Sequence, residues 1–353
     1  VIEDALLDEE RQNLLIGIAR RHRRGKACAE FGLATMDLST GEFTTTQIDG
    51  PDAEQVFWEE FGRLGPSEVV LSRHLSEDEP FVDQLRSFHP DRISPVEDEA
   101  FSPAVAGENL RAHFVVASLE GFGCDNLPLA TAAAGGVLHY LCSNQISELS
   151  HIIGLTTYDL DAYVSLDAVS QQNLELLQTL RTGRKEGSLY QVLDRTQTAM
   201  GRRLLSRWIV QPLADLPSLS RRQDAVTELF DRPLLRSDLR AQLDQIYDVE
   251  RLVGRIGFGS ANARDLVMLR SVLECMPQIC ALLANFDAPF LHDIRTALQK
   301  DALSKVASAI ASAIVDDPPI LLREGGLIQS GYDSELDRLR SVASAGREWL
   351  TKL

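Results

Sequence analysis

The chain has 353 residues, more than a single hydrophobic core usually organises, so we expect at least two domains. Its formal net charge is −17, from 52 acidic against 35 basic residues. Such an acidic chain repels phosphate overall, which argues against a protein that coats nucleic acid by itself. Five scattered cysteines without a C-x-x-C pair indicate a reduced, cytoplasmic compartment.

The sequence gives no sign of a membrane span or a metal site. The best apolar run, Leu127–Cys142, is interrupted by a proline, two glycines and a histidine, which predicts a buried helix. The histidines form no H-E-x-x-H motif and no cluster with cysteines, so no structural metal is expected. The chain starts at Val1 and stops at Lys352-Leu353 inside a helical pattern, and we expect a fragment of a longer protein.

The first part of the chain has the pattern of an α/β domain, in which strands are followed by alternating helices and strands. Strands are expected at Asn13–Ala19, Ala27–Thr40, Glu42–Ile48, Glu68–Leu71 and Arg92–Ile93. Helices are expected at Ala53–Leu64, Glu79–Phe88, Leu110–Leu119 and Leu127–Ser143. The Pro- and acid-rich residues 94–108 are expected to form a loop, and 149–166 one or two short strands.

Beyond Leu166 apolar residues recur three and four positions apart, which predicts a nearly all-helical region. Its expected helices are Ala168–Leu177, Ser188–Leu193, Ala199–Val210, Leu216–Phe230, Arg236–Gln245, Val249–Ile256, Ala261–Cys275, Pro277–Ala284, Phe290–Leu298, Leu303–Ile314 and Gly331–Lys352. No fixed-period repeat is present, which disfavours a solenoid.

Asp37 is the candidate for metal-assisted phosphoryl chemistry, because ribonuclease-H-like nucleases hold a metal on a mid-strand carboxylate. That chemistry needs two or more converging carboxylates. Glu30 and Glu42 lie seven and five residues away, and no clear second ligand follows. We therefore expect Asp37 to order the Ser39–Gly41 turn, with a nuclease as the alternative.

Basic residues gather in the run Arg20–Lys26, which has five permanent cations in seven residues. We expect a solvated hairpin tip, with a phosphate contact or a partner's acidic surface as the alternatives. Two glycine-containing segments, Thr182–Gly187 and Gly326–Gly331, resemble phosphate loops only superficially. The first follows a helix and lacks the G-x-x-x-x-G-K-[ST] spacing, and the second has the glycine spacing but Tyr332-Asp333 in place of Lys-Ser/Thr. Both are expected to be turns.

Three arginines, Arg202, Arg203 and Arg207, form a basic face on the expected helix that stops at Gln211-Pro212. They indicate a solvated face or, alternatively, salt bridges to an adjoining domain that moves. Acids also stand near arginines in Asp248–Arg251 and in Ala263–Leu266. Such pairs can fix the register of neighbouring helices, although exposed pairs stabilise little.

Several segments, taken in order, resemble the connector and lever domains of the MutS family of DNA mismatch-repair proteins. The connector segments are Ala5–Leu7 with Asn13–Leu15, Leu33–Phe43 (LATMDLSTGEF), Leu119–Gly123 and Ala132–Gly136. The lever segments are Leu166–Glu175 (LDAVSQQNLE), Gly187–Leu213, Asp248–Ile256 with Ala263–Leu266, and Gly325–Leu339. The similarity runs through nearly the whole chain.

The resemblance implies a multidomain α/β plus all-α protein. Residues 1–162 would form a ribonuclease-H-like connector that ends in helices. Residues 163–353 would form the first part of an α-helical lever, truncated near the clamp insertion. In the family the lever transmits ATP-state changes to the clamp, so a relay between mismatch binding and ATP state is implied. Interdomain relay contacts are expected at Arg202, Arg203, Arg207, Asp248 and Arg251.

The family's mismatch reader with its Phe-x-Glu wedge, its clamp and its P-loop ATPase domain match no position here. Catalytic, cofactor-binding and metal residues are therefore expected to be none, with ATP and Mg assigned to a parent protein. The implied partners are a MutL homologue, mismatched DNA through the parent's other domains, and a second copy in a homodimer. Glu108, Asn109 and Arg111 are the expected MutL-docking residues. An architectural helical scaffold unrelated to DNA is a further alternative.

Overall fold

A computed structural model describes residues 13–22, 29–88, 90, 92–144, 149, 152–320 and 322–351. It divides into two compact units. Unit 1 comprises Val1–Ser220 and Val253–Gly259, and unit 2 comprises Arg221–Leu252 and Ser260–Leu353. The mixed sheet and the many helices confirm the α/β plus helical class expected from the sequence. Residues 23–28 lie outside the described residues, and with them most of the expected hairpin tip at Arg20–Lys26.

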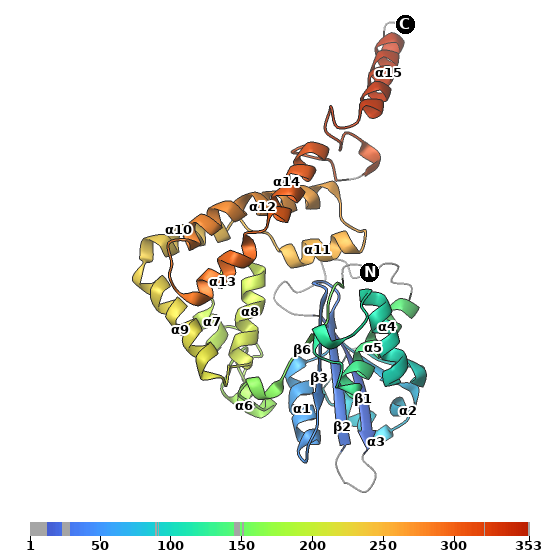
Figure 1. Cartoon of the computed structure of the whole chain (residues 1–353), viewed down its shortest axis with the longest axis vertical. Coiled ribbons are helices and arrows are strands. Elements are labelled where there is room, and N and C mark those ends of the chain that lie inside the picture. Colours follow the sequence, from blue (N-terminus) through green and yellow to red (C-terminus); the bar gives the residue numbers. More distant parts are fainter. Residues whose placement is uncertain are drawn as a thin grey trace. The chain divides into compact units, whose positions relative to one another are not determined.

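Unit 1 is built on a six-stranded mixed sheet (Figure 1). Its strands are β1 Leu14–His22, β2 Ala29–Asp37, β3 Glu42–Ile48, β4 Glu68–Ser72, β5 Arg92–Val96 and β6 Thr156–Thr157. They lie in the order β5-β4-β1-β2-β3-β6. The pairs β1–β2 and β2–β3 are antiparallel, whereas β4, β5 and β6 pair in parallel with their neighbours. The register sets Asp37 opposite Glu42 where β2 turns into β3.

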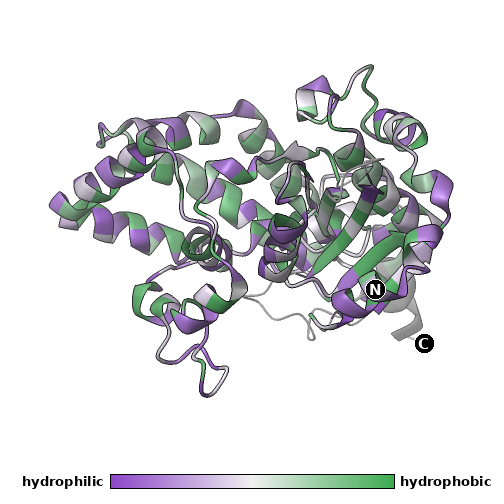
Figure 2. Ribbon diagram, turned by 90° about the horizontal axis from the view of Figure 1, so that it is seen from below, coloured by the Kyte–Doolittle hydropathy of each residue, from purple (hydrophilic) through white to green (hydrophobic). Residues whose placement is uncertain are grey.

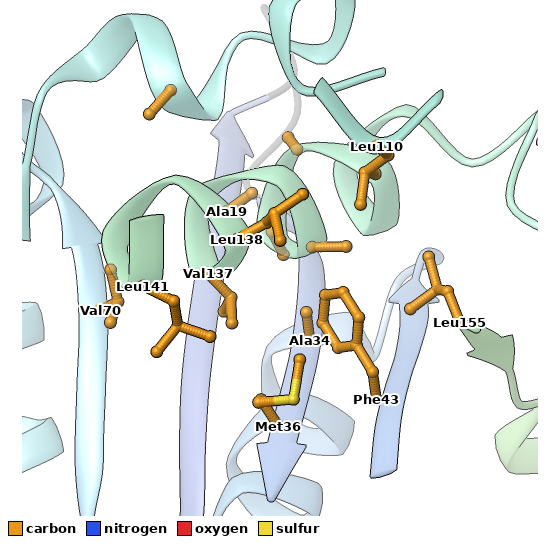
Figure 3. Close-up of a cluster of buried hydrophobic side chains, with 14 of the residues drawn as sticks. Ala19, Ala34, Met36, Phe43, Val70, Leu110, Val137, Leu138, Leu141 and Leu155 are labelled. Atoms are coloured by element: carbon orange, nitrogen blue, oxygen red, sulfur yellow. The ribbon is translucent and has the colours of Figure 1, made fainter. Parts of the chain in front are cut away.

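Helices cover both faces of this sheet. Those that follow the opening strands are α1 Ala53–Leu64, α2 Arg73–Ser76, α3 Glu79–Arg86, α4 Pro103–Phe114 and α5 Pro128–Ser143. On one face α1 and α3 enclose an aromatic cluster in which the Phe31 and Phe57 rings stack 4.2 Å apart. On the other face α5 packs on β1 and β2, and Val137, Leu141, Met36 and Phe43 meet in one apolar cluster (Figure 3). Two-sided burial explains why the strands β1, β2 and β4 are predominantly hydrophobic (Figure 2).

Glycines allow α5 to approach the sheet closely. A Cβ on Gly32 would lie 2.0 Å from the carbonyl oxygen of Leu129, and one on Gly17 would lie 2.7 Å from that of Ala133. Along the same helix, Gly135 faces Ala106 of α4 in the same way. Backbone therefore packs on backbone at the centre of unit 1, which only residues without a Cβ permit.

Unit 1 continues beyond β6 into helices of the predicted lever. These are α6 Ala168–Asn173, α7 Leu189–Leu193 and α8 Ala199–Val210. Asp167, Ser188 and Thr198 cap their first turns by accepting hydrogen bonds from backbone N–H groups. The chain then enters α9 Leu216–Asp231, and it returns to unit 1 with Val253–Gly259, which includes the end of α11 Val249–Gly257.

Unit 2 is helical. Its other helices are α10 Pro233–Leu243, α12 Ala263–Leu283, α13 Pro289–Leu298, α14 Asp301–Ala313 and α15 Ser334–Thr351. One apolar cluster joins Ala225 of α9 with Ile279, Leu283 and Leu291. A second joins Ala263 of α12 with Ile310 of α14 and with Ile314. Arg270 of α12 also binds Asp316 at 2.8 Å, which ties this helix to the segment after α14.

Among the described residues one helix, α12, is long and apolar enough to cross a bilayer by length and composition alone. Two helices, Ala261–Cys275 and Pro277–Ala284, had been expected in its place, and Leu127–Cys142 had been the best apolar run. Arg270 and Glu274 lie inside α12, and the helix contacts α10, α13 and α14. One helix of this kind is weak support for a membrane span.

Three expectations about the helices were wrong. Residues 94–108 are not a loop, because β5 extends to Val96 and α4 begins at Pro103, where proline suits the first turn of a helix. The helix expected at Leu110–Leu119 accordingly ends at Phe114. Pro277 does not divide α12 either, since buried Val272, Ile279 and Leu283 on both sides hold the helix together.

Candidate relay junction at the β2–β3 turn

The turn between β2 and β3 is shaped by Asp37. Its Oδ1 accepts hydrogen bonds from the backbone N of Ser39 at 2.9 Å and from the Ser39 hydroxyl at 2.6 Å. The Asp37 carbonyl accepts the N–H of Gly41 at 2.8 Å, and Gly41 adopts a φ of 75° that suits glycine. The expectation that Asp37 orders the Ser39–Gly41 turn is confirmed.

The Asp37 side chain is almost completely buried, at 1% exposure. Burial raises the pKa of this carboxyl above its ordinary value, while the hydrogen bonds from Ser39 act in the opposite direction. Its Oδ2 atom is buried and has no hydrogen-bond partner among the described residues. A carboxylate held in this way fixes a turn at some cost in stability.

Glu42, directly after the turn, binds the predicted lever. Arg207 of α8 donates from Nη2 to Glu42 Oε2 at 2.7 Å. Both side chains keep roughly a third of their surface exposed, at 38% and 35%. The pair is therefore screened by solvent and contributes at most about 1 kcal/mol. Its value lies in joining β3 to α8.

Gly254 of α11 meets the same turn. A Cβ at this position would lie 2.3 Å from the carbonyl oxygen of Ser39 and 3.2 Å from its carbonyl carbon. The helix backbone thus packs directly on the backbone of the turn. Residues 37–42 are therefore contacted by two helices that follow far along the chain, and all of these residues belong to unit 1.

The connecting segment, residues 158–165, leads from the sheet to the helices of the predicted lever and is hydrogen-bonded to α1. The Tyr158 hydroxyl donates to Glu60 at 2.7 Å, and Arg63 binds the same carboxylate at 2.6 Å. Burial and the charge of Glu60 raise the pKa of Tyr158 well above its ordinary value, so this hydroxyl stays a donor. Further along, Ser165 donates to Glu59 at 2.9 Å.

The same segment is also paired with the chain that follows α8. The N–H of Val164 binds the Pro212 carbonyl at 2.8 Å, and the N–H of Ala214 binds the Ala162 carbonyl at 3.0 Å. The Gln211-Pro212 stop thus returns the chain to the connecting segment. Both ends of α8 are then fixed, because Thr198 caps its start.

The other expected relay residues lie in separate places. Arg202 is 4.0 Å from Asp194, the residue that follows α7, and Arg203 is buried at 6% exposure. In unit 2 Asp248 accepts the N–H of Arg251 at 3.4 Å, and the two side chains lie 3.8 Å apart at the start of α11. The structure therefore brings Arg207 to the turn, whereas the pair of Asp248 and Arg251 organises its own helix. Their relay roles stay predictions.

The expected docking residues all lie on α4, although Glu108 had been expected in a loop. Glu108 is exposed, whereas Asn109 and Arg111 are half-buried. Docking by these residues stays a prediction. Arg111 Nη1 lies 3.3 Å from the position that a Cβ on Gly107 would take.

The nuclease alternative receives no support from this site. Glu30 is bound by Arg21 at 2.5 Å and Glu42 by Arg207 at 2.7 Å, so each of these carboxylates has an arginine as a partner. No group of three His, Cys, Asp or Glu side chains suited to a metal occurs among the described residues. The segment 182–187 consists of turns and bends, with Gly183 and Gly187 at positive φ. In the segment 326–331, Ile328 forms a bridge with Ile314, and a turn follows at residues 330–331.

Two family models match consecutive parts of the chain. Residues 13–153 match the family model of MutS domain II, and residues 169–351 match that of MutS domain III. The chain belongs to the MutS family. It is 43% identical over its full length to the DNA mismatch repair protein MutS of Symbiobacterium thermophilum. The proteins of the same name from Methanosarcina barkeri and Nostoc punctiforme are both 40% identical, over 99% and 100% of the chain.

The chain spans 39% of the length of each of these three relatives, so it corresponds to a fragment of a MutS protein. Seen within MutS, the turn at 37–42 belongs to the matched domain II, whereas Arg207 and Gly254 belong to domain III. Gly254, Tyr158 and Glu60 were not among the site residues expected from the sequence. An isolated glycine inside a helical pattern is a signal that could have drawn attention to Gly254.

Proposed function

We propose that this chain is the mechanical middle of a MutS-type mismatch-repair ATPase and relays mismatch binding and ATP state between domains. The ion pair of Glu42 and Arg207 carries the proposal, because it joins the predicted connector to the predicted lever within one compact unit. Rigid elements with two packing arrangements are suited to such coupling. The domain boundary at 162/163 is part of the proposal.

The connector is proposed to be a ribonuclease-H-like domain that lacks a catalytic metal site. The mixed sheet, with three consecutive antiparallel strands followed by parallel ones and helices on both faces, supports this assignment. Asp37 would then be a structural residue of the turn, in line with its hydrogen bonds to Ser39. The chain would catalyse nothing alone, and ATP with Mg would bind other domains of the parent protein in the cytoplasm.

The proposal is tested by comparing the 353-residue chain with the full-length parent protein. The parent should bind mismatched duplexes tightly and change its rate of ATP turnover when it does so, whereas the chain should do neither. The MutS relatives are named for mismatch repair, which supports this choice of substrate. Rapid ATP turnover or tight mismatch binding by the chain itself would contradict the assignment of these activities to other domains.

We further propose that α4 presents Glu108, Asn109 and Arg111 to a MutL homologue, and that the parent acts as a homodimer. Exposure of Glu108 on the helix surface supports docking there. Charge reversal at Glu108 and Arg111 should weaken capture of the MutL homologue by the mismatch-bound parent. The exposed pair Asp83 and Arg86 on α3 provides a control, since its reversal should leave capture unchanged.

A further inference from the structure

Gly254 occupies a place in α11 that no other residue type can fill without movement. The position of its absent Cβ lies 2.3 Å from Ser39 O, 3.2 Å from Ser39 C and 3.9 Å from Leu38 O. All three are backbone atoms, so no side-chain rotation can make room. The glycine hydrogen that replaces the Cβ points at the Ser39 carbonyl, the arrangement of a weak Cα–H···O contact.

The β2–β3 turn is held in place and cannot easily move away from α11. Asp37 holds Ser39 by two hydrogen bonds, and the N–H of Gly41 closes the turn on the Asp37 carbonyl. Met36 and Phe43, on either side, are paired across β2 and β3 and are buried in the apolar core. Any added atom at position 254 must therefore displace α11 and leave the turn where it is.

A second helix of domain III contacts the same turn. Arg207 of α8 reaches Glu42, three residues beyond Ser39. Two helices of domain III thus engage the five residues 38–42 of domain II, one through an ion pair and the other through a glycine. A glycine inside a helix is unfavourable by about 1 kcal/mol relative to alanine. The close contact with Ser39 gives a physical reason for its presence.

We propose that Gly254 is a positioning residue for coupling between the two domains. It allows the backbone of α11 to pack directly on the β2–β3 turn. The helix then has two arrangements, one in contact with the turn and one moved away from it. This inference rests on the proposed relay function and assigns part of the relay to the contact between Gly254 and Ser39. Gly254 touches no nucleotide or DNA in this role and acts only through the placement of α11.

The experiment uses the full-length parent protein and the variants Gly254→Ala and Gly107→Ala. Both substitutions replace a helical glycine with alanine, but the Cβ at position 107 meets only the movable end of Arg111, at 3.3 Å. ATP turnover is measured without DNA, with a perfect duplex and with a mismatched duplex, in the absence of a MutL homologue. The readout is the ratio of turnover with mismatched DNA to turnover without DNA, together with mismatch affinity.

We expect Gly254→Ala to bring this ratio closer to one by roughly 2- to 30-fold, with turnover without DNA and mismatch affinity changed less than about twofold. Gly107→Ala should behave like the unchanged protein. A mismatch-dependent ratio that survives Gly254→Ala intact overturns the inference and leaves the relay function standing. If the unchanged parent shows no dependence on the mismatch, the relay function itself fails.

A second variant keeps the inference testable if Gly254→Ala does not yield folded protein. Glu42→Gln removes the charge that Arg207 binds and leaves the glycine contact in place. It should change the ratio in the same direction, because both contacts act on the same turn. An unchanged ratio would mean that this turn does not carry the coupling, which overturns the inference. In the 353-residue chain, Gly254→Ala should also speed hydrogen exchange at the Phe258 amide, which bonds to the Gly254 carbonyl.

Discussion

Glu42 and Arg207 are 165 positions apart in the sequence, yet their side chains meet at 2.7 Å. Local sequence cannot hold such a contact, because loop closure over this distance has to be offset by the packing of everything between them. The connecting segment is fixed on α1 by Tyr158 and paired with the chain after α8. The ion pair thus reports on the whole arrangement of unit 1.

A double-mutant cycle with Glu42→Gln and Arg207→Gln should give a coupling energy of about 0.2–1 kcal/mol. The value should fall as salt is raised toward 1 M, because both side chains are partly exposed. Urea unfolding of the four proteins measures it. The pair Asp83 and Arg86 on α3 is exposed at 70% and 66% and should couple less. Equal coupling for the two pairs would speak against a special role for Arg207.

Asp37→Asn should change how stability depends on pH. The folded-state pKa of Asp37 is raised by burial above the ordinary 3.8, so the folded protein holds this proton more tightly than the unfolded chain. The free energy of unfolding should therefore fall as the pH rises from 3.8 through the raised value, and then level off. Asparagine cannot lose a proton, so the variant should lack this decline.

Asp167→Asn provides a control of opposite sign. The hydrogen bonds from Ser170 lower the pKa of Asp167, so its contribution is present above pH 3.8 and is lost as the pH falls through the lowered value. Urea unfolding between pH 3 and 7 measures both variants against the unchanged chain. A difference between the unchanged chain and Asp37→Asn that does not vary with pH would contradict the assignment.

Local chemistry made part of the junction predictable. The order Asp37, Ser39, Gly41 has the side chains and the backbone freedom that a tight turn needs, and the turn formed as expected. The helix Ala199–Val210 was also placed correctly, because Thr198 caps its start and Pro212 follows its end. Arg207 was singled out as one of three arginines on this helix, but its partner Glu42 was not.

The features that could not be predicted from the sequence depend mainly on tertiary contacts. Nothing in the residues around Gly254 shows that its neighbour is the carbonyl of Ser39, because that contact exists only once both elements are packed. The placement of Glu108 failed for a local reason, since Pro103 was taken as a loop residue when it opens α4. Pro277 was taken as a helix stop, yet the packing around Ile279 overrides its local preference.

Gly32→Ala should be among the most damaging small substitutions in unit 1. Its Cβ would fall 2.0 Å from the Leu129 carbonyl oxygen, so either α5 or β2 must shift. We expect a loss of about 1–3 kcal/mol or more in the free energy of unfolding, measured by thermal and urea denaturation. Gly121→Ala, whose Cβ meets nothing within 4 Å, should change it by less than about 0.5 kcal/mol. Similar losses for the two variants would rule out the close contact as the cause.

Val115→Gly should stabilise the chain. Val115 ends α4 in the left-handed region at a φ of 54°, which is unfavourable for a β-branched residue, and its side chain is 89% exposed. Relief of about 1–2 kcal/mol of strain exceeds the roughly 0.5–1 kcal/mol by which glycine favours the unfolded chain. The melting temperature should therefore rise.

Glu175→Gly is the matched comparison for Val115→Gly. Glu175 also has a positive φ, 48°, but its carboxylate accepts the N–H of Leu180 at 2.7 Å. Loss of this hydrogen bond, about 0.5–1.5 kcal/mol, should cancel the relief of strain. A rise in melting temperature for Glu175→Gly equal to that for Val115→Gly would show that the carboxylate contributes nothing.

Tyr158→Phe should loosen the segment that joins the sheet to the lever helices. The variant deletes the hydroxyl that donates to Glu60 and leaves the pair of Glu60 and Arg63 with one partner fewer. The expected loss is about 1–3 kcal/mol, with faster hydrogen exchange at the Val164 amide. Tyr140→Phe removes a similar hydroxyl, bound to Glu68 at 2.5 Å, and should leave exchange at Val164 unchanged. Faster exchange at Val164 in both variants would mean that general destabilisation, and not the contact with Glu60, governs this segment.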